Sequence, residues 1–163
     1  MAKKIDPLNK KMYGAVTAIL TVTDMKAAVN FYKKAFGFIS RSIMNGPDGK
    51  PMHAELRLRD TTLMLSSEMS GARSAKNVGA SPVTLYLPVE KVDKVVANAV
   101  KLGATLKGPV TDMFWGDRSG AVVDLDGYIW MIATHVAEPT AQEMKKKMKA
   151  MMGAQAAGTS SGS

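Results

Sequence analysis

Cysteine is absent from the 163-residue chain, which excludes disulfides, thiolate metal sites and a cysteine nucleophile. No apolar run approaches the roughly 20 residues that a membrane-spanning helix needs, so we expect no membrane contact. Aromatic residues make up only 6% of the chain. No basic helix carries interleaved stacking residues, so we expect no nucleic acid partner. The opening residues MAKKIDPLNKKMYG lack the apolar segment of a secretory signal, which makes the cytoplasm the expected location.

The formal net charge of +8 is concentrated at the two ends of the chain. Residues 1–13 carry four lysines and one aspartate, and residues 138–163 carry four lysines and two glutamates, which leaves +3 for the body between them. Lysine-rich ends of this kind are typically solvated and keep a protein soluble. Residues 1–13 are therefore predicted to be a polar N-terminal segment.

The body contains an internal repeat of a strand followed by a helix. The apolar segments AVTAILTV and SPVTLYLPV are strand-like, and their equivalent residues Thr17 and Thr84 lie 67 positions apart. After the first strand, Asp24 is suited to cap a helix and Gly37 to end it. Apolar residues recur at helical spacing in both units, namely Ala28, Val29, Tyr32 and Phe36 in the first and Val92, Val95, Val96, Ala99 and Leu102 in the second.

Three strand-like segments follow each helix, separated by turn sequences such as NGPDGK and Asp126-Gly127. The order β-α-β-β-β therefore occurs twice, over modules of about residues 14–68 and 81–136. Alternating apolar and polar residues within a duplicated unit predict an α+β fold. In this fold, the two βαβββ modules form curved mixed sheets around a cleft.

A further helix is predicted after the second module. Thr140 and Glu143 have the spacing of a capping box, and methionines then recur among lysines. Residues 137–152 are therefore predicted to contain a C-terminal amphipathic helix whose methionine stripe packs on the domain or on a second subunit. Residues 153–163, GAQAAGTSSGS, are predicted to form a disordered tail.

Five segments carry a resemblance to a known family. VTDMKAAVNFYKKAFGF is similar to a V-x-D…FY…LGF start, and VVDLDGYIW is similar to a DPDG turn. With the repeated βαβββ order, they resemble the vicinal oxygen chelate superfamily of glyoxalases, extradiol dioxygenases and bleomycin-resistance proteins. MHAELRLRDTTLMLSSE, FWGDRSGAVVDLDG and WMIATHV look like its PhnB-like branch. The resemblance implies a glyoxalase/bleomycin-resistance-like domain over residues 14–136.

The resemblance also implies where a metal would be held. In metal-using members, each module contributes one ligand from its first strand and one from its last, giving two His or Gln and two Glu. The equivalent positions here are Thr17, Met64, Thr84 and Met131. Hard divalent ions prefer imidazole nitrogen and carboxylate oxygen over hydroxyl and thioether groups. No cofactor is therefore expected in the cleft.

Strand parity indicates which other side chains face the cleft. In MHAELRLRD, Ala54 and Leu56 should pack under the helix, while His53 and Glu55 lie on the other face. That polar face is either solvated or orients a ligand, and a general acid/base role for His53 beside Glu55 is chemically possible. Trp130 is predicted to be in the core.

The predicted ligand site is an apolar cup with hydroxyl groups at intervals. Trp115 lies in the loop MFWGDR, where it either covers the cleft or has a structural role. Arg118 either pairs with Asp117 or binds an anionic ligand. The complete predicted set is Thr17, His53, Glu55, Met64, Thr84, Tyr86, Trp115, Arg118 and Met131.

These features predict a metal-independent protein that binds a small organic ligand, and that sequesters an antibiotic or a metabolite. The alternative is a lyase, isomerase or oxygenase whose divalent metal ion uses His53, Glu55 or His135 from unusual positions. A third hypothesis is an interaction protein whose cleft is filled by its own side chains. A homodimer is also expected, because relatives commonly complete their clefts across subunits.

Overall fold

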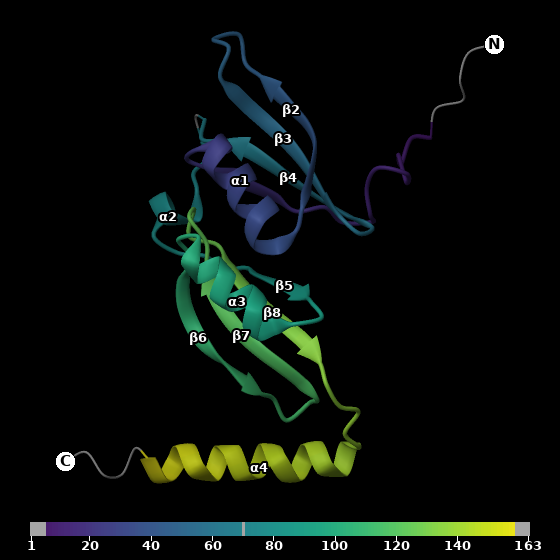
Figure 1. The fold of residues 1–163 in the computed structure, drawn as a ribbon, viewed down its shortest axis with the longest axis vertical. Helices are drawn as coiled ribbons and strands as arrows, with labels where there is room; N and C mark the ends of the chain where they lie inside the picture. The colour runs from purple at the N-terminus through teal and green to yellow at the C-terminus, as the bar shows by residue number, and fades with distance from the viewer. Residues whose placement is uncertain (1–5, 70, 159–163) are drawn as a thin grey trace.

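The computed structural model describes residues 6–69 and 71–158 and has the α+β architecture expected from the repeat (Figure 1). The first module contains β1 (Ile19–Val22), α1 (Met25–Phe36), β2 (Ile39–Asn45), β3 (Pro51–Leu58) and β4 (Thr61–Ser67). The second contains β5 (Thr84–Pro88), α3 (Val92–Lys101), β6 (Thr105–Asp112), β7 (Asp117–Val123) and β8 (Ile129–His135). A short helix, α2 (Ala75–Val78), connects the modules, and α4 (Ala141–Gly158) follows them.

Each module builds one four-stranded mixed sheet, and both sheets have the same topology. The strand order is β1-β4-β3-β2 in the first sheet and β5-β8-β7-β6 in the second. β1 runs parallel to β4 and β5 runs parallel to β8, whereas the other pairs are antiparallel. Figure 1 shows the sheets next to each other, with α1 over the first and α3 over the second. The prediction of two βαβββ modules is confirmed.

The first module forms where its local sequence signals predict. The Asp24 carboxylate accepts a hydrogen bond from the backbone N–H of Ala27 at 3.0 Å and so caps α1. Gly37 ends this helix with a left-handed φ of 80°. On β3, Ala54 and Leu56 have no exposed surface, because their side of the strand packs under α1. Strand parity therefore determines which face of the sheet is left open.

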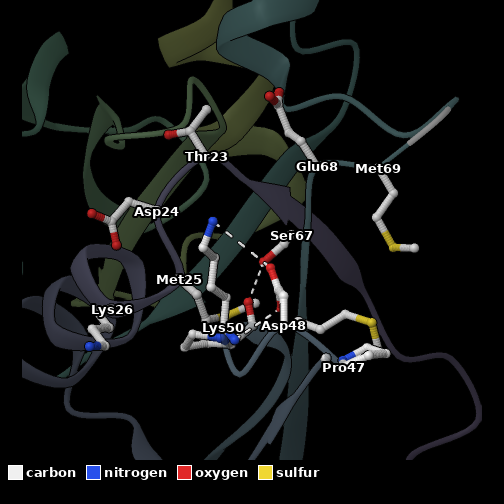
Figure 2. A pocket seen from close by; sticks show the side chains of 13 residues that line it. Thr23, Asp24, Met25, Lys26, Pro47, Asp48, Lys50, Ser67, Glu68 and Met69 are labelled. Atoms are coloured by element: carbon white, nitrogen blue, oxygen red, sulfur yellow. Dashed lines mark hydrogen bonds and ion pairs between the residues drawn. The ribbon is translucent and has the colours of Figure 1, made fainter.

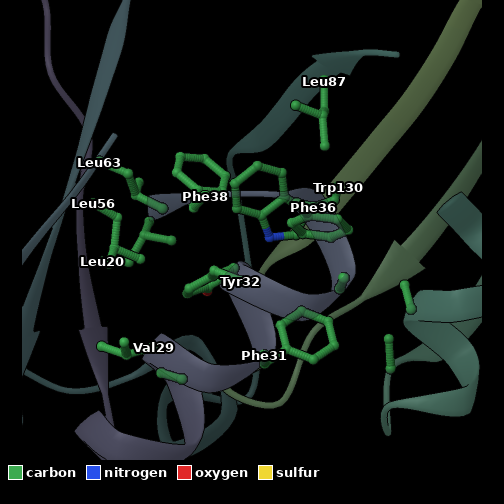
Figure 3. Packing of buried hydrophobic residues seen from close by; sticks show 14 of the residues in the cluster. Leu20, Val29, Phe31, Tyr32, Phe36, Phe38, Leu56, Leu63, Leu87 and Trp130 are labelled. Atoms are coloured by element: carbon green, nitrogen blue, oxygen red, sulfur yellow. The ribbon is translucent and has the colours of Figure 1, made fainter. Parts of the chain in front are cut away.

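One hydrophobic core extends across both modules (Figure 3). Phe31, Tyr32 and Phe36 of α1 pack against one another, and Phe38, which directly precedes β2, joins them. Trp130 of β8 enters this aromatic group from the second module, with its ring centroid 4.8 Å from that of Phe36 and 5.6 Å from that of Tyr32. Only 4% of Trp130 is exposed, which confirms its predicted place in the core.

A buried carboxylate strengthens this junction. Asp124, which follows β7, accepts hydrogen bonds at Oδ2 from the Tyr32 hydroxyl at 2.6 Å and from Trp130 Nε1 at 2.8 Å. Its Oδ1 accepts from the backbone N–H groups of Asp126 and Tyr128, which shapes the Asp-Gly turn. Burial raises the pKa of Asp124 above its usual value, although the four hydrogen bonds oppose this shift.

The edge strand β1 is held in place by the turn of the other module. The Tyr128 hydroxyl accepts a hydrogen bond from the Thr21 N–H and donates one to the Thr21 carbonyl, both at 2.9 Å. Thr23 donates its backbone N–H and its hydroxyl to Asp126 Oδ1, at 2.7 and 2.8 Å. These contacts join segments more than 100 residues apart and set the position of the two sheets relative to each other.

The C-terminal helix differs from its predicted bounds. The capping box is present, since the backbone N–H and hydroxyl of Thr140 both donate to Glu143 Oε2 at 2.8 Å. However, α4 continues to Gly158 instead of ending at residue 152, because the alanine and glutamine residues beyond that point favour a helix. The rest of the predicted tail, residues 159–163, lies outside the described residues. Figure 1 shows α4 apart from both sheets. None of the helices described is both long and apolar enough to span a membrane.

Candidate ligand-binding site

The open face of the paired sheets is the side that α1 and α3 leave uncovered. Met64 on β4 lies on this face, opposite Ile19 on β1 and Glu55 on β3. Met131 occupies the equivalent place in the second sheet, opposite Tyr86 on β5. Residues paired across strands share a face of the sheet, so each thioether and its neighbours line the open face of their own sheet.

The two threonines of the predicted cup frame the same surface. Thr84 begins β5, where it is exposed and lies opposite Ile129 on β8. Thr17 lies two residues before β1, and its hydroxyl is buried without a hydrogen-bond partner within the described part of the chain. A buried hydroxyl without a partner is uncommon in proteins. The Thr17 hydroxyl is covered by other protein atoms, so it presents no donor or acceptor at the surface of the open face.

The end of the N-terminal segment covers part of the first sheet. The Tyr13 hydroxyl donates to Glu55 Oε1 at 2.5 Å, and this bond raises the pKa of Tyr13. The Met12 carbonyl accepts from the Thr62 hydroxyl at 2.6 Å. Residues 1–13 were expected to be solvated, but residues 12–13 bind the sheet because its polar residues supply hydrogen-bond partners; residues 1–5 lie outside the described residues.

His53 and Glu55 share the open face of β3, as parity predicts, but the carboxylate of Glu55 is directed to another partner. Glu55 is bound to Tyr13, while His53 lies opposite Ser66 on β4 and Met44 on β2. No hydrogen bond joins the imidazole to the carboxylate among the contacts described. The geometry in which Glu55 orients His53 for proton transfer is therefore not formed.

In the second module, Asp117 gathers three other side chains on the open face. Its Oδ2 accepts hydrogen bonds from the Tyr86 hydroxyl at 2.7 Å and from Trp115 Nε1 at 2.9 Å. Its Oδ1 lies 2.9 Å from His135 Nδ1. Burial, with the bond to Asp117, raises the pKa of Tyr86 to about 12, while the His135 and Tyr86 bonds lower the pKa of Asp117. The structure thus brings Tyr86 and Trp115 together.

Arg118 points to the opposite side of the sheet. Its Nη2 lies 2.8 Å from Asp93 Oδ1 on α3, and its Nη1 lies 2.9 Å from Asp112 Oδ1. These contacts, with Asp93 first, raise the pKa of Arg118. Consecutive strand residues face opposite ways, so Asp117 on the open face places Arg118 on the helix side. The expected contact of Arg118 with a cleft ligand, or with Asp117, is replaced by these two ion pairs.

A separate hollow of about 510 Å³ lies at the end of the first module (Figure 2). Its charged groups have both signs, and several are engaged within the protein. Asp24 caps α1, and Lys50 lies 3.9 Å from Asp48. Glu68 accepts hydrogen bonds from Ser74 and Asn77. This hollow therefore favours no single class of ligand.

The comparison with known families agrees with the topology of the sheets. Residues 14–132 match the family model of the Glyoxalase/Bleomycin resistance protein/Dioxygenase superfamily. The chain belongs to this superfamily. An uncharacterized protein of Mycobacterium tuberculosis is 37% identical to it over 139 residues, which cover 82% of each chain.

Two solved structures show the same glyoxalase-superfamily fold. A gene product of Arabidopsis thaliana is 28% identical, with a TM-score of 0.62, and the match covers 74% of this chain and 98% of that one. TioX from Micromonospora is 26% identical, with a TM-score of 0.59, and the match covers 76% of this chain and all (100%) of TioX.

In this superfamily member, the donor set does not fit the divalent ion used by metal-dependent relatives. Thr17, Met64, Thr84 and Met131 provide hydroxyl and thioether groups, which bring no negative charge to balance a divalent ion. Elsewhere in residues 6–69 and 71–158, no three His, Asp or Glu side chains are arranged to hold a metal ion.

The pKa of His135 is expected to lie above that of an ordinary imidazole. Its Nδ1 contacts Asp117 and its Nε2 lies 2.8 Å from Glu138 Oε1, so both nitrogens can donate only when the ring is protonated. These bonds, with Asp117 first, raise the pKa of His135. The contribution of protonated His135 to the stability of the fold should be complete below the unfolded pKa of about 6.5. It should disappear as the pH rises through the folded pKa.

Nuclear magnetic resonance of the His135 ring protons measures this pKa directly. Glu138→Gln should lower it towards the ordinary value, because one of the two carboxylates is lost. Glu143→Gln, which changes a carboxylate bonded to Thr140 instead, is the control and should leave it unchanged. An unshifted pKa in the unmodified protein would show that these ion pairs do not form in solution.

Proposed function

We propose that this protein binds a small organic molecule on the open face of its sheets and that no metal ion takes part. The observation that carries the proposal is the donor set of Thr17, Met64, Thr84 and Met131. Apolar surface with a few polar groups is typical of small-molecule sites. Thioether and aromatic side chains can bury a ligand without requiring a charged partner.

The exposure of apolar groups supports a binding role. Ile19 is 60% exposed, and Met44 and Tyr86 are each 52% exposed. All three lie on the open face, according to their strand pairing. Exposed apolar side chains of this kind can provide contact area for a ligand or partner. An antibiotic or a metabolite with an aromatic or aliphatic body is the proposed ligand, and sequestration is the proposed activity.

Thermal-shift screening of antibiotics and metabolites, with and without EDTA, tests the proposal. A true ligand at 100 times its dissociation constant should stabilise the protein by about 2.7 kcal/mol, equally with and without the chelator. Tyr86→Ala should weaken binding about tenfold, since it removes an apolar contact. Val100→Ala is the matched control, because Val100 is an exposed apolar residue on α3.

The other hypotheses predict different results. Stabilisation that requires Fe, Ni, Zn or Mn and disappears in EDTA would favour the metal-dependent lyase, isomerase or oxygenase. Elemental analysis of the purified protein would then show a stoichiometric metal. The absence of any ligand-induced stabilisation would favour an interaction protein. That hypothesis gains support from Asp117, which already holds Tyr86 and Trp115 over the second sheet.

Three finer assignments are also proposed. The phrases shared with the PhnB-like branch support membership of that branch. The exposed apolar side chains of the open face support a homodimer in which this face is partly covered. A cytoplasmic location fits a chain without cysteine.

A further inference from the structure

A cavity of about 480 Å³ lies between β1, α2 and β5, beside the seam of the two modules. None of the nine residues predicted to bind ligand lines it. Three of its apolar residues, Ile19, Val78 and Val83, are 60%, 61% and 62% exposed. The volume lies within the range of about 300–1,000 Å³ that is usual for small-molecule sites. Its walls can therefore bury an apolar molecule.

The polar groups that line this cavity are engaged with the protein, with one exception. The Tyr128 hydroxyl is bonded to both backbone groups of Thr21. The Ser81 hydroxyl donates to the Val83 carbonyl at 2.9 Å. The Arg73 guanidinium, by contrast, makes no hydrogen bond or ion pair with the residues that the structure describes. One cation is thus left for a ligand.

The carboxylate of Glu68, which lies near Arg73, is already bonded to other groups. Glu68 lies close enough to Arg73 for its pKa to be lowered by the positive charge, but the larger causes are its bonds to Ser74 and Asn77. Glu68 Oε1 accepts from the Ser74 N–H and hydroxyl, both at 2.8 Å. The Arg73 guanidinium therefore keeps its donors available at the edge of an apolar cavity.

We propose that this cavity binds an amphipathic monoanion, namely a carboxylate with an aliphatic or aromatic body. A guanidinium can bind a carboxylate through two parallel hydrogen bonds, while the apolar walls bury the body. A cationic ligand would be repelled by Arg73, and a polyol would lose its hydration without gaining partners. The proposal does not depend on the open-face function, because it rests on Arg73 and Val78, although Ile19 contributes to both surfaces.

Calorimetric titration with decanoate tests this site, with decanol and decyltrimethylammonium as probes of the same chain length. Decanoate should bind at least tenfold more tightly than either. Arg73→Gln should weaken the binding of decanoate about tenfold and leave the binding of decanol unchanged. Lys33→Gln is the matched control, since it removes an exposed cation from α1, and it should have no effect.

Val78 provides a second test that does not depend on Arg73. Because Val78 is exposed on α2, Val78→Glu and Val78→Lys should both fold. The added negative charge of Val78→Glu should weaken decanoate binding, and the added positive charge of Val78→Lys should strengthen it. Equal binding of all three probes, or an Arg73→Gln protein that binds decanoate normally, would overturn the proposal. So would sedimentation showing a dimer that dissociates in Val78→Glu and excludes decanoate.

The two sites are distinguished by their variants. Tyr86→Ala should leave decanoate binding unchanged, because Tyr86 does not line this cavity. Arg73→Gln should leave the binding of an open-face ligand unchanged. Loss of both ligands in both variants would contradict the separation of the two sites.

Discussion

Replacing Asp124 with alanine is expected to lower the free energy of unfolding by about 3–5 kcal/mol. The substitution leaves the Tyr32 hydroxyl and the Trp130 N–H without their acceptor, and these residues are only 1% and 4% exposed. Each buried donor without a partner costs about 1–3 kcal/mol. A typical domain is stable by only about 5–15 kcal/mol, so urea denaturation should detect the change readily.

Two further variants separate the contributions. Tyr32→Phe removes one donor and keeps the aromatic packing, so it should cost about 1 kcal/mol. Asp24→Ala removes an exposed helix cap and should also cost about 1 kcal/mol. If Asp124→Ala were no more harmful than Asp24→Ala, Asp124 would not be the junction between the modules that its contacts indicate.

The pH dependence of the same carboxylate has a definite sign. Because burial raises the folded pKa of Asp124, the native state binds a proton more readily than the unfolded state. Stability relative to Asp124→Asn should therefore fall as pH rises from about 4 through the folded pKa. A difference between the two proteins that rises with pH would contradict the shift.

Most of the fold follows from patterns that are local in the sequence. Asp24 and Gly37 bound α1 as expected, because a cap and a left-handed stop act on their own helix. The alternation of Ala54 and Leu56 with His53 and Glu55 predicts the buried face of β3, since strand geometry has a period of two. Local rules of this kind do not extend to α2, whose four residues are too few to give a periodic signal.

The site was less predictable, because its contacts are between distant segments. Tyr13 binds Glu55 across 42 positions, and no spacing rule connects a polar N-terminal residue to a strand. Tyr86 and His135 both contact Asp117. This meeting could be predicted only if the order of β5, β8 and β7 in the sheet were known. Parity applied to Asp117 and Arg118 would have placed these neighbours on opposite faces. By contrast, the residue types at Thr17, Met64, Thr84 and Met131 could be read from the sequence alone, and they already argued against a site for a hard divalent ion.

Gly127→Ala is expected to destabilise the protein by about 3–4 kcal/mol, through two separate effects. Its φ of 89° is in the left-handed region, which costs other residues about 1–2 kcal/mol. A Cβ atom at Gly127 would also lie 2.5 Å from the Lys76 nitrogen and 2.9 Å from its Cα. Crowding in a packed interior costs about 1–3 kcal/mol. Urea denaturation measures the total.

Gly49→Ala is the matched control that isolates the steric effect. Gly49 has a similar φ of 77°, but a Cβ atom there would have no neighbour within 4 Å. It should therefore show only the conformational cost. The excess loss in Gly127→Ala then reports how tightly α2 packs on the Asp-Gly turn, where the Lys76 N–H donates to the Asp126 carbonyl at 2.7 Å. Because α2 also forms a wall of the cavity that Arg73 lines, Gly127→Ala should weaken decanoate binding. Equal losses of the free energy of unfolding in Gly127→Ala and Gly49→Ala would show that α2 is not docked on the turn.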